Sequence, residues 1–136
     1  MNERLAPPAA PGDASTDAPA AGHGKAVLDD IRPLTRDLRR AIPDVYRAFG
    51  DLHGAAFAAG ALDTKTKELI ALAISVAERC DGCIASHARG AVAAGASDQE
   101  AAEAIGVAIL MAGGPATVYG PRALAAVKEF RAASGV

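Results

Sequence analysis

Apolar residues recur at helical spacing along most of this chain, and no segment alternates with a period of two. The clearest apolar stripe comprises Ala101, Ala104, Ile105, Ala108, Ile109 and Ala112. The preceding segment Ser97-Asp98-Gln99-Glu100 has the S-x-x-E pattern of a capping box, and Gly113-Gly114-Pro115 follows the stripe. The hydrophobic pattern therefore predicts an all-α fold.

The same signals predict about six helices in all. Together with the Gly and Pro positions they indicate further helices over residues 26–41, 44–59, 64–79, 82–94 and 116–132. Pro33 should break or bend the first, Pro43 suits the first turn of the second, and Asp63 is a good N-cap for the third. That third helix is apolar nearly all round after Glu68, so we expect it at the centre of the core.

Composition limits the chain to one domain with a modest core. Residues 1–25 are rich in Pro, Ala, Gly, Ser and Asp, which predicts a disordered tail and leaves residues 26–136 as one helical domain. Hydrophobic residues make up 51% of the 136 residues but aromatic ones only 4%, with alanine dominant. Small side chains bury little apolar area each, so we expect a thin core and a homo-oligomer that covers the remaining apolar surface.

Charge argues against nucleic acid as a partner, and the length of the apolar runs argues against a membrane. The net charge is −2, and the densest basic cluster, Arg36, Arg39 and Arg40, is interrupted by Asp37 and has no interleaved aromatic residue. We interpret this cluster as a solvated helix face. No apolar run approaches the roughly 20 residues that span a bilayer, and the first residues lack the apolar core of a signal peptide. We therefore expect the protein in the cytoplasm.

Four residues carry the candidate chemistry: Glu68, Cys80, Cys83 and His87, in the pattern E-x11-C-x2-C-x3-H. In a reducing compartment two cysteines are more often catalytic or metal-binding than structural. Two thiols three residues apart can meet as a disulfide or as a donor pair. His87 lies four residues beyond Cys83 and so on the same helix face. A nearby base and a helix N-terminus both favour the reactive thiolate, so we interpret the pattern as a thiol redox site.

Other uses of these residues remain open at this point. Zinc needs four ligands, and only the two cysteines, His87 and His53 are plausibly placed, at a spacing that matches no common zinc module. Covalent haem attachment needs His directly after the second Cys, where Ile84 stands. Glu68 reaches the site only if its helix and the next one fold back as an antiparallel pair. His53 and Tyr119 could line a pocket, but we interpret them as ordinary helix residues.

The quartet, followed by an Ala/Gly-rich helix and a capped helix, resembles the AhpD-like alkylhydroperoxidases of the carboxymuconolactone decarboxylase superfamily. The resemblance covers about residues 43–130 and includes the Gly-Ala-Leu-Asp turn that leads into a Lys-Glu helix start. It implies an all-α fold that assembles as homotrimers or homohexamers, with the site near subunit contacts. It implies no metal or other cofactor.

The resemblance also implies a role for each member of the quartet. Cys83 would be the peroxidatic cysteine, Cys80 the resolving cysteine and proton donor, and His87 with Glu68 the proton relay. The substrate would be a small organic hydroperoxide, and a lipoyl-type or thioredoxin-like dithiol protein would be the reductant. Some members have a second His directly before the second Cys; Gly82 stands there in this chain, which implies a shorter relay.

A second functional class fits the same cysteine pair. A redox-sensing or assembly protein would switch an interface between dithiol and disulfide without turnover. A metal-binding module is a third possibility. The first two differ in whether a dithiol recycles the oxidised protein, and zinc in the purified protein would indicate the third.

Overall fold

The computed structural model describes residues 22–135, which form six α-helices. These are α1 Lys25–Ala41, α2 Pro43–Phe57, α3 Thr64–Ala77, α4 Asp81–Ala93, α5 Asp98–Ala112 and α6 Gly114–Ser134. The predictions of an all-α fold and of about six helices are confirmed. Residues 1–21, which hold most of the predicted tail, lie outside the described residues. Among residues 22–135, no helix is both long enough and apolar enough to cross a membrane.

Helices α3 to α6 form a bundle in which α3 packs on α4, α4 on α6, α6 on α5 and α5 on α3. Its core consists mainly of alanines, with Leu72, Val76, Ile84 and Val127 as the largest fully buried side chains. Helices α5 and α6 approach closely, because a Cβ on Gly120 would lie 2.8 Å from the Ile105 Cγ2 atom. The small side chains that dominate the composition therefore let these helices pack closely.

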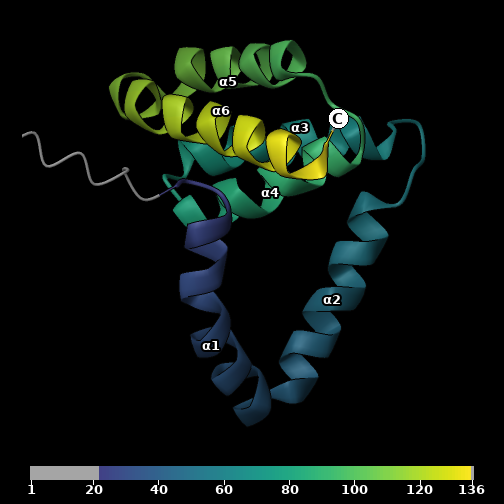
Figure 1. The fold of residues 1–136 in the computed structure, drawn as a ribbon. Helices are drawn as coiled ribbons and strands as arrows, with labels where there is room; N and C mark the ends of the chain where they lie inside the picture. The colour runs from purple at the N-terminus through teal and green to yellow at the C-terminus, as the bar shows by residue number, and fades with distance from the viewer. Residues whose placement is uncertain (1–21, 136) are drawn as a thin grey trace, which may run out of the picture.

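Helices α1 and α2 extend from this bundle as a V-shaped arm (Figure 1). Neither contains a buried residue, and α1 packs mainly against α4. Pro33 was predicted to break or bend this helix; it lies inside α1, which continues through it, so it does not break the helix. The start of α1 is held to the bundle by the Glu129 carboxylate of α6, which accepts hydrogen bonds from the backbone N–H groups of Gly24 and Lys25 at 3.0 Å.

One prediction about the core is wrong in part. Helix α3 contributes the fully buried Leu72 and Val76, but Ile70 and Ile74 on its other face are 46% and 56% exposed. The all-round apolar character of α3 therefore does not reflect burial on all sides within one chain. The α5 side chains Val107, Leu110 and Met111 are also exposed, so apolar surface continues across both helices.

Candidate functional site

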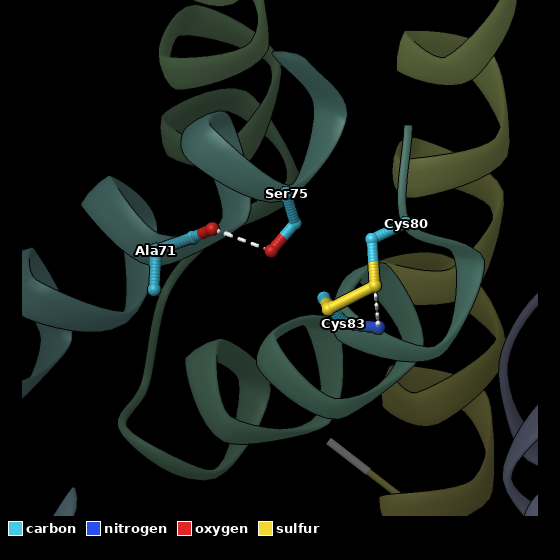
Figure 2. Close-up of a disulfide and its surroundings, with 4 residues drawn as sticks. All are labelled: Ala71, Ser75, Cys80 and Cys83. Carbon is cyan, nitrogen blue, oxygen red and sulfur yellow. Dashed lines mark hydrogen bonds between the residues drawn. A yellow bond between two sulfur atoms is a disulfide. The ribbon is translucent and has the colours of Figure 1, made fainter. Parts of the chain in front are cut away.

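Cys80 and Cys83 lie where α3 passes into α4, and they form a disulfide (Figure 2). Their sulfur atoms are 2.07 Å apart and their Cα atoms 5.2 Å apart. Cys80 is the N-cap of α4, and its Sγ accepts a hydrogen bond from the backbone N–H of Cys83 at 3.2 Å. Both sulfurs therefore lie at the positive end of the α4 dipole, which favours a thiolate when the pair is reduced.

The turn that places this pair depends on Arg79. Its φ of 56° lies in the left-handed region, which is unfavourable for a residue with a Cβ. The following Cys80 N–H donates to the carbonyl of Ser75 at 3.1 Å. This turn spans residues 78–80, between the end of α3 at Ala77 and the start of α4 at Asp81. The Ser75 hydroxyl in turn donates to the Ala71 carbonyl at 2.7 Å. Helix α4 can then fold back along α3, against which it packs.

The two cysteines differ in their exposure to solvent. Cys83 is exposed, whereas Cys80 is half-buried. A reaction with a dissolved molecule therefore meets Cys83 first, and Cys80 is held beside it by the helix cap. Access is one of the factors that decide which thiol of a pair reacts first.

Glu68 and His87 meet across the α3–α4 interface. The Glu68 Oε2 atom lies 2.9 Å from the His87 Nδ1 atom, and only 11% of the Glu68 side chain and 20% of the His87 side chain are exposed. With Glu68 ionised, Nδ1 carries the proton and donates to the carboxylate. The lone pair on Nε2 is then available to accept a proton. The condition that the sequence left open, an antiparallel return of α4 on α3, is met for Glu68.

The fold thus places Glu68, Cys83 and His87 on two packed helices, with Cys80 at the N-cap of the second. His87 lies one turn after Cys83 on α4, and Glu68 reaches it from α3. In this oxidised state, no hydrogen bond joins His87 to either sulfur among residues 22–135. The catalytic roles given to the four residues stay predictions.

Gly90 supports the site, and sequence analysis did not identify it. A Cβ on Gly90 would lie 2.5 Å from the Glu68 Cδ and Oε1 atoms and 2.6 Å from Oε2. Glycine in a helix interior is normally unfavourable. Its place here lets α4 approach the carboxylate, so Gly90 determines where Glu68 can lie. Its position one turn after His87 on an otherwise regular helix was the available signal.

Two rings of the arm, those of Phe57 and His53, stack beside His87. Phe57, in the last turn of α2, lies 5.5 Å from the His87 ring centroid with 15° between the planes. His53 stacks on Phe57 at 4.5 Å. The interpretation of His53 as an ordinary helix residue therefore misses its contact with the site. Tyr119 lies apart from this stack: it packs against the core, and the Arg122 guanidinium sits 4.7 Å above its ring.

Arg122 also ties α6 to the first turn of α4 through an ion pair with Asp81, at 3.2 Å. Asp81 follows Cys80 directly, so this contact helps to fix the cysteine turn on the bundle. Within residues 22–135, no three His, Cys, Asp or Glu side chains converge as a set of metal ligands.

Known proteins resemble this chain in both sequence and fold. The sequence model of the carboxymuconolactone decarboxylase family matches residues 43–129. An uncharacterized protein of the cox locus of Paracoccus denitrificans is 41% identical over 91 residues, which are 67% of this chain and 82% of that protein. An uncharacterized protein of Cupriavidus necator is 34% identical over 106 residues, covering 68% of this chain and 94% of that protein.

Two solved structures of family proteins superpose on this chain. One, an apo form from Legionella pneumophila, is 41% identical with a TM-score of 0.74, and the match covers 77% of this chain and 94% of the other. The second, from Thermotoga maritima, has a suggested involvement in antioxidative response; it is 34% identical with a TM-score of 0.69, over 82% of this chain and 94% of the other. By sequence and by fold, this chain belongs to the carboxymuconolactone decarboxylase family.

Proposed function

We propose that the protein is a thiol-dependent peroxidase, or disulfide reductase, that reduces small organic hydroperoxides through Cys80 and Cys83. The observation that carries the proposal is the joined pair of cysteines with Cys83 exposed, on the same helix as a histidine that a buried carboxylate orients. The suggested antioxidative role of the Thermotoga relative supports it. The proposed cycle needs a reducing compartment, for which we propose the cytoplasm.

The first step forms one S–O bond and breaks one O–O bond. The Cys83 thiolate attacks the outer oxygen of the hydroperoxide ROOH, giving the Cys83 sulfenic acid and ROH. Cys83 is oxidised by two electrons, and the O–O bond is reduced. Before the attack, the proton of the Cys83 thiol passes to the Nε2 atom of His87, whose ring is oriented by the bond from Nδ1 to Glu68. The same proton then passes to the departing alkoxide.

The second step closes the disulfide. The Cys80 sulfur attacks the Cys83 sulfenic sulfur, the S–S bond forms, and the hydroxyl leaves as water with the Cys80 proton. A dithiol protein of the lipoyl or thioredoxin type then transfers two electrons and two protons, regenerating both thiols while its own pair becomes a disulfide. Exposure of Cys83 makes it the sulfur that such a partner would reach.

The test compares two single serine variants of the reduced protein. With excess alkyl hydroperoxide, wild type should lose two hydrogens by intact mass, mapped to a Cys80–Cys83 bond. Cys80→Ser should stop at the Cys83 sulfenic acid, trapped by dimedone, and Cys83→Ser should consume no peroxide. Peroxide consumption at the wild-type rate by Cys83→Ser would overturn the proposal.

A redox switch without turnover is the second candidate. The ring of Phe57, in α2, stacks on that of His87. A movement of His87 on reduction of the disulfide would therefore be transmitted directly to the arm. Under this alternative the reduced protein oxidises quickly, but no dithiol supports repeated turnover. Multiple turnovers with dihydrolipoamide would exclude it.

We further propose that the protein is a homo-oligomer, a trimer or a hexamer. An apolar groove of about 350 Å³ runs between α3 and α5, lined by residues such as Ile70, Ile74 and Val107. The arm carries its own uncovered apolar side chains, including Leu34, Phe49 and Leu52, each more than 60% exposed. A second copy would cover such surfaces. Ile74→Glu should lower the mass measured by light scattering, and an unchanged mass would contradict this groove as the interface.

A further inference from the structure

A cleft of about 400 Å³ opens between α1 and α4, the helix that carries Cys83 and His87. Its charged lining is wholly basic, and it consists of four arginines: Arg32, Arg36, Arg39 and Arg89. The hydroxyl residues Thr35 and Ser86 also line it, and no Asp or Glu does. Guanidinium groups and hydroxyls are donors, so the cleft offers hydrogen bonds and positive charge to an acceptor.

Most of this charge has no partner within the described part of the chain. Arg32 pairs with Asp29 at 3.1 Å, but Arg36, Arg39 and Arg89 form no ion pair there. The Arg39 guanidinium instead lies 5.3 Å from the centroid of the Tyr46 ring. Like charges gathered in one cleft repel one another, so a bound anion would be stabilised by all of them.

The neighbouring arginine outside the cleft behaves differently. Arg40 pairs with Asp37 at 3.7 Å and does not line the cleft. We interpreted Arg36, Arg39 and Arg40 as a solvated helix face. That interpretation fits Arg40, whereas Arg36 and Arg39 line the cleft. Helix α1 turns the other two toward α4, where Arg89 joins them.

The remaining lining is apolar. Leu28 and Ile31 contribute aliphatic surface from α1. A ligand that uses the whole cleft thus combines an anionic group with a hydrocarbon part. The volume of the cleft falls in the usual range of small-molecule sites, about 300 to 1,000 Å³.

The cleft adjoins the redox site through Ser86. This residue lies three positions after Cys83 on α4, and His87 follows it. Side chains at this spacing are neighbours on a helix, with Cβ atoms about 5 to 6 Å apart. A molecule held by the arginines can therefore extend along α4 to the exposed Cys83 sulfur.

We propose that the cleft between α1 and α4 binds the carboxylate or phosphate of an amphiphilic organic anion and so directs anionic substrates to Cys83. The substrate role rests on the proposed peroxidase function; the anion site rests on the cleft itself. The arginines bind and position the substrate, while the bond changes at Cys83 are those of the proposed cycle.

The first experiment measures binding without turnover. The oxidised full-length protein is titrated calorimetrically with octanoate, octyl phosphate and octanol. Octanoate or octyl phosphate should bind at least about tenfold more tightly than octanol, as expected for charge-assisted hydrogen bonds, and binding should weaken with added salt. The stronger of the two anions identifies the head group. Equal binding of octanol and both anions would overturn the proposal.

Charge-matched variants locate the site. Arg36→Gln and Arg89→Gln should each weaken octanoate binding by about tenfold. Arg40→Gln removes the same charge from the same helix as Arg36→Gln and should change it less than about twofold. Equal effects of the Arg36 and Arg40 changes would overturn the site, and so would tighter binding of an oligoglutamate peptide than of octanoate, which would favour a protein partner.

The second experiment measures turnover of a medium-chain hydroperoxy fatty acid and of its methyl ester. The acid should have a kcat/KM about tenfold higher than the ester, and Arg89→Gln should reduce that ratio. Equal kcat/KM values would overturn the substrate role while leaving peroxidase activity in place. Octanoate binding with no reduction of either hydroperoxide would overturn the proposed function and leave the anion site standing.

Discussion

The Glu68 carboxylate fills the space beside the Cα of Gly90, so that a single methyl group at position 90 would lie 2.5 Å from the Glu68 Cδ and Oε1 atoms. The same carboxylate binds His87 at 2.9 Å. A glycine one helical turn from the histidine therefore sets the position of the group that orients it. Filling this space should impair the proposed proton relay more than it destabilises the fold.

Gly90→Ala is predicted to displace Glu68 and to slow peroxide reduction by at least about tenfold. Overpacking costs about 1 to 3 kcal/mol, and the gain in helix propensity offsets about 1 kcal/mol of it, so the net loss of stability should be at most about 2 kcal/mol. Thermal unfolding and the rate of disulfide formation with hydroperoxide measure the two effects.

Gly106→Ala is the matched control for that change. Gly106 lies inside α5, and a Cβ there would have no neighbour within 4 Å. The variant should gain up to about 1 kcal/mol and keep the wild-type rate. A Gly90→Ala protein as active as Gly106→Ala would show that the position of Glu68 does not matter for the reaction.

Glu68→Gln tests the carboxylate itself at nearly constant shape. An amide at position 68 can donate to Nδ1, which would place the imidazole proton on Nε2 and remove the base. We predict a rate of Cys83 oxidation lower by about 100-fold, the low end of what general-base catalysis contributes. Stopped-flow mixing of the reduced protein with hydroperoxide gives this rate.

The pH dependence separates this role from a structural one. If the relay acts by forming the thiolate, the rate of Glu68→Gln should approach that of wild type at alkaline pH, where the thiol ionises without help. Glu78→Gln, an exposed change at the end of α3, serves as control and should follow wild type at every pH. A deficit of Glu68→Gln that stays constant with pH would contradict the relay.

Reduction of the Cys80–Cys83 disulfide should leave the fold intact. The bond closes a loop with a sequence separation of only 3, for which the loss of chain entropy in the unfolded state corresponds to about 2 kcal/mol. The α4 cap can persist, because a reduced Cys80 sulfur still accepts from the Cys83 N–H. Denaturant unfolding with and without a phosphine reductant measures the difference. Unfolding on reduction would contradict a site that cycles between both states.

The parts of the fold that follow from local sequence signals could be predicted from the sequence. Asp63 accepts from the Thr66 N–H at 2.7 Å, and Ser97 with Glu100 forms the complete capping box, as their spacing indicated. These contacts join residues three positions apart, so the sequence alone contains both partners. The first residues of α3 and α5 followed from them, whereas α3 ends at Ala77, two residues before the predicted end.

Contacts between helices could not be predicted in the same way. Gly90 reads as a weak helix former until Glu68 is seen beside it, and Arg36 reads as solvated until Arg89 approaches from α4. The exposure of Ile70 likewise depends on which face of an all-round apolar helix the bundle covers. Periodicity identifies a helix and its apolar side chains, but the choice among partners is made by the tertiary arrangement.

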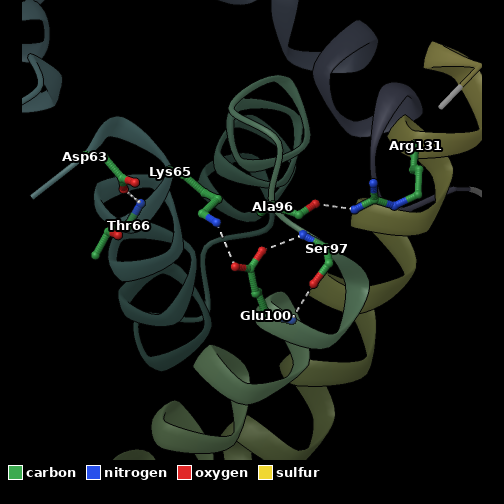
Figure 3. Close-up of polar contacts among 7 residues, drawn as sticks. All are labelled: Asp63, Lys65, Thr66, Ala96, Ser97, Glu100 and Arg131. Carbon is green, nitrogen blue, oxygen red and sulfur yellow. Dashed lines mark hydrogen bonds and ion pairs between the residues drawn. The ribbon is translucent and has the colours of Figure 1, made fainter.

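An ion pair between Lys65 of α3 and Glu100 of α5, 2.7 Å long, predicts part of the dependence of stability on pH (Figure 3). The hydrogen bond from Lys65, followed by that from the Ser97 backbone N–H, holds the pKa of Glu100 below its ordinary value of 4.5. The stability that this carboxylate contributes is therefore fully present above pH 4.5 and is lost as the pH falls through the lowered pKa of the folded state. The pKa of Lys65 is raised above 10.5, chiefly by Glu100, so its contribution is lost only as the pH rises through that higher value.

Glu100→Gln should consequently flatten the acid limb of the stability profile. It should not abolish that limb, because Asp63 also has a lowered pKa, owing to Thr66. Urea unfolding over a series of acidic buffers measures the slope. Glu103→Gln on the same helix removes an exposed charge but keeps an oxygen that can accept from Gln99, so it serves as the control and should run parallel to wild type. An acid limb as steep in Glu100→Gln as in wild type would mean that the pair contributes nothing to the folded state.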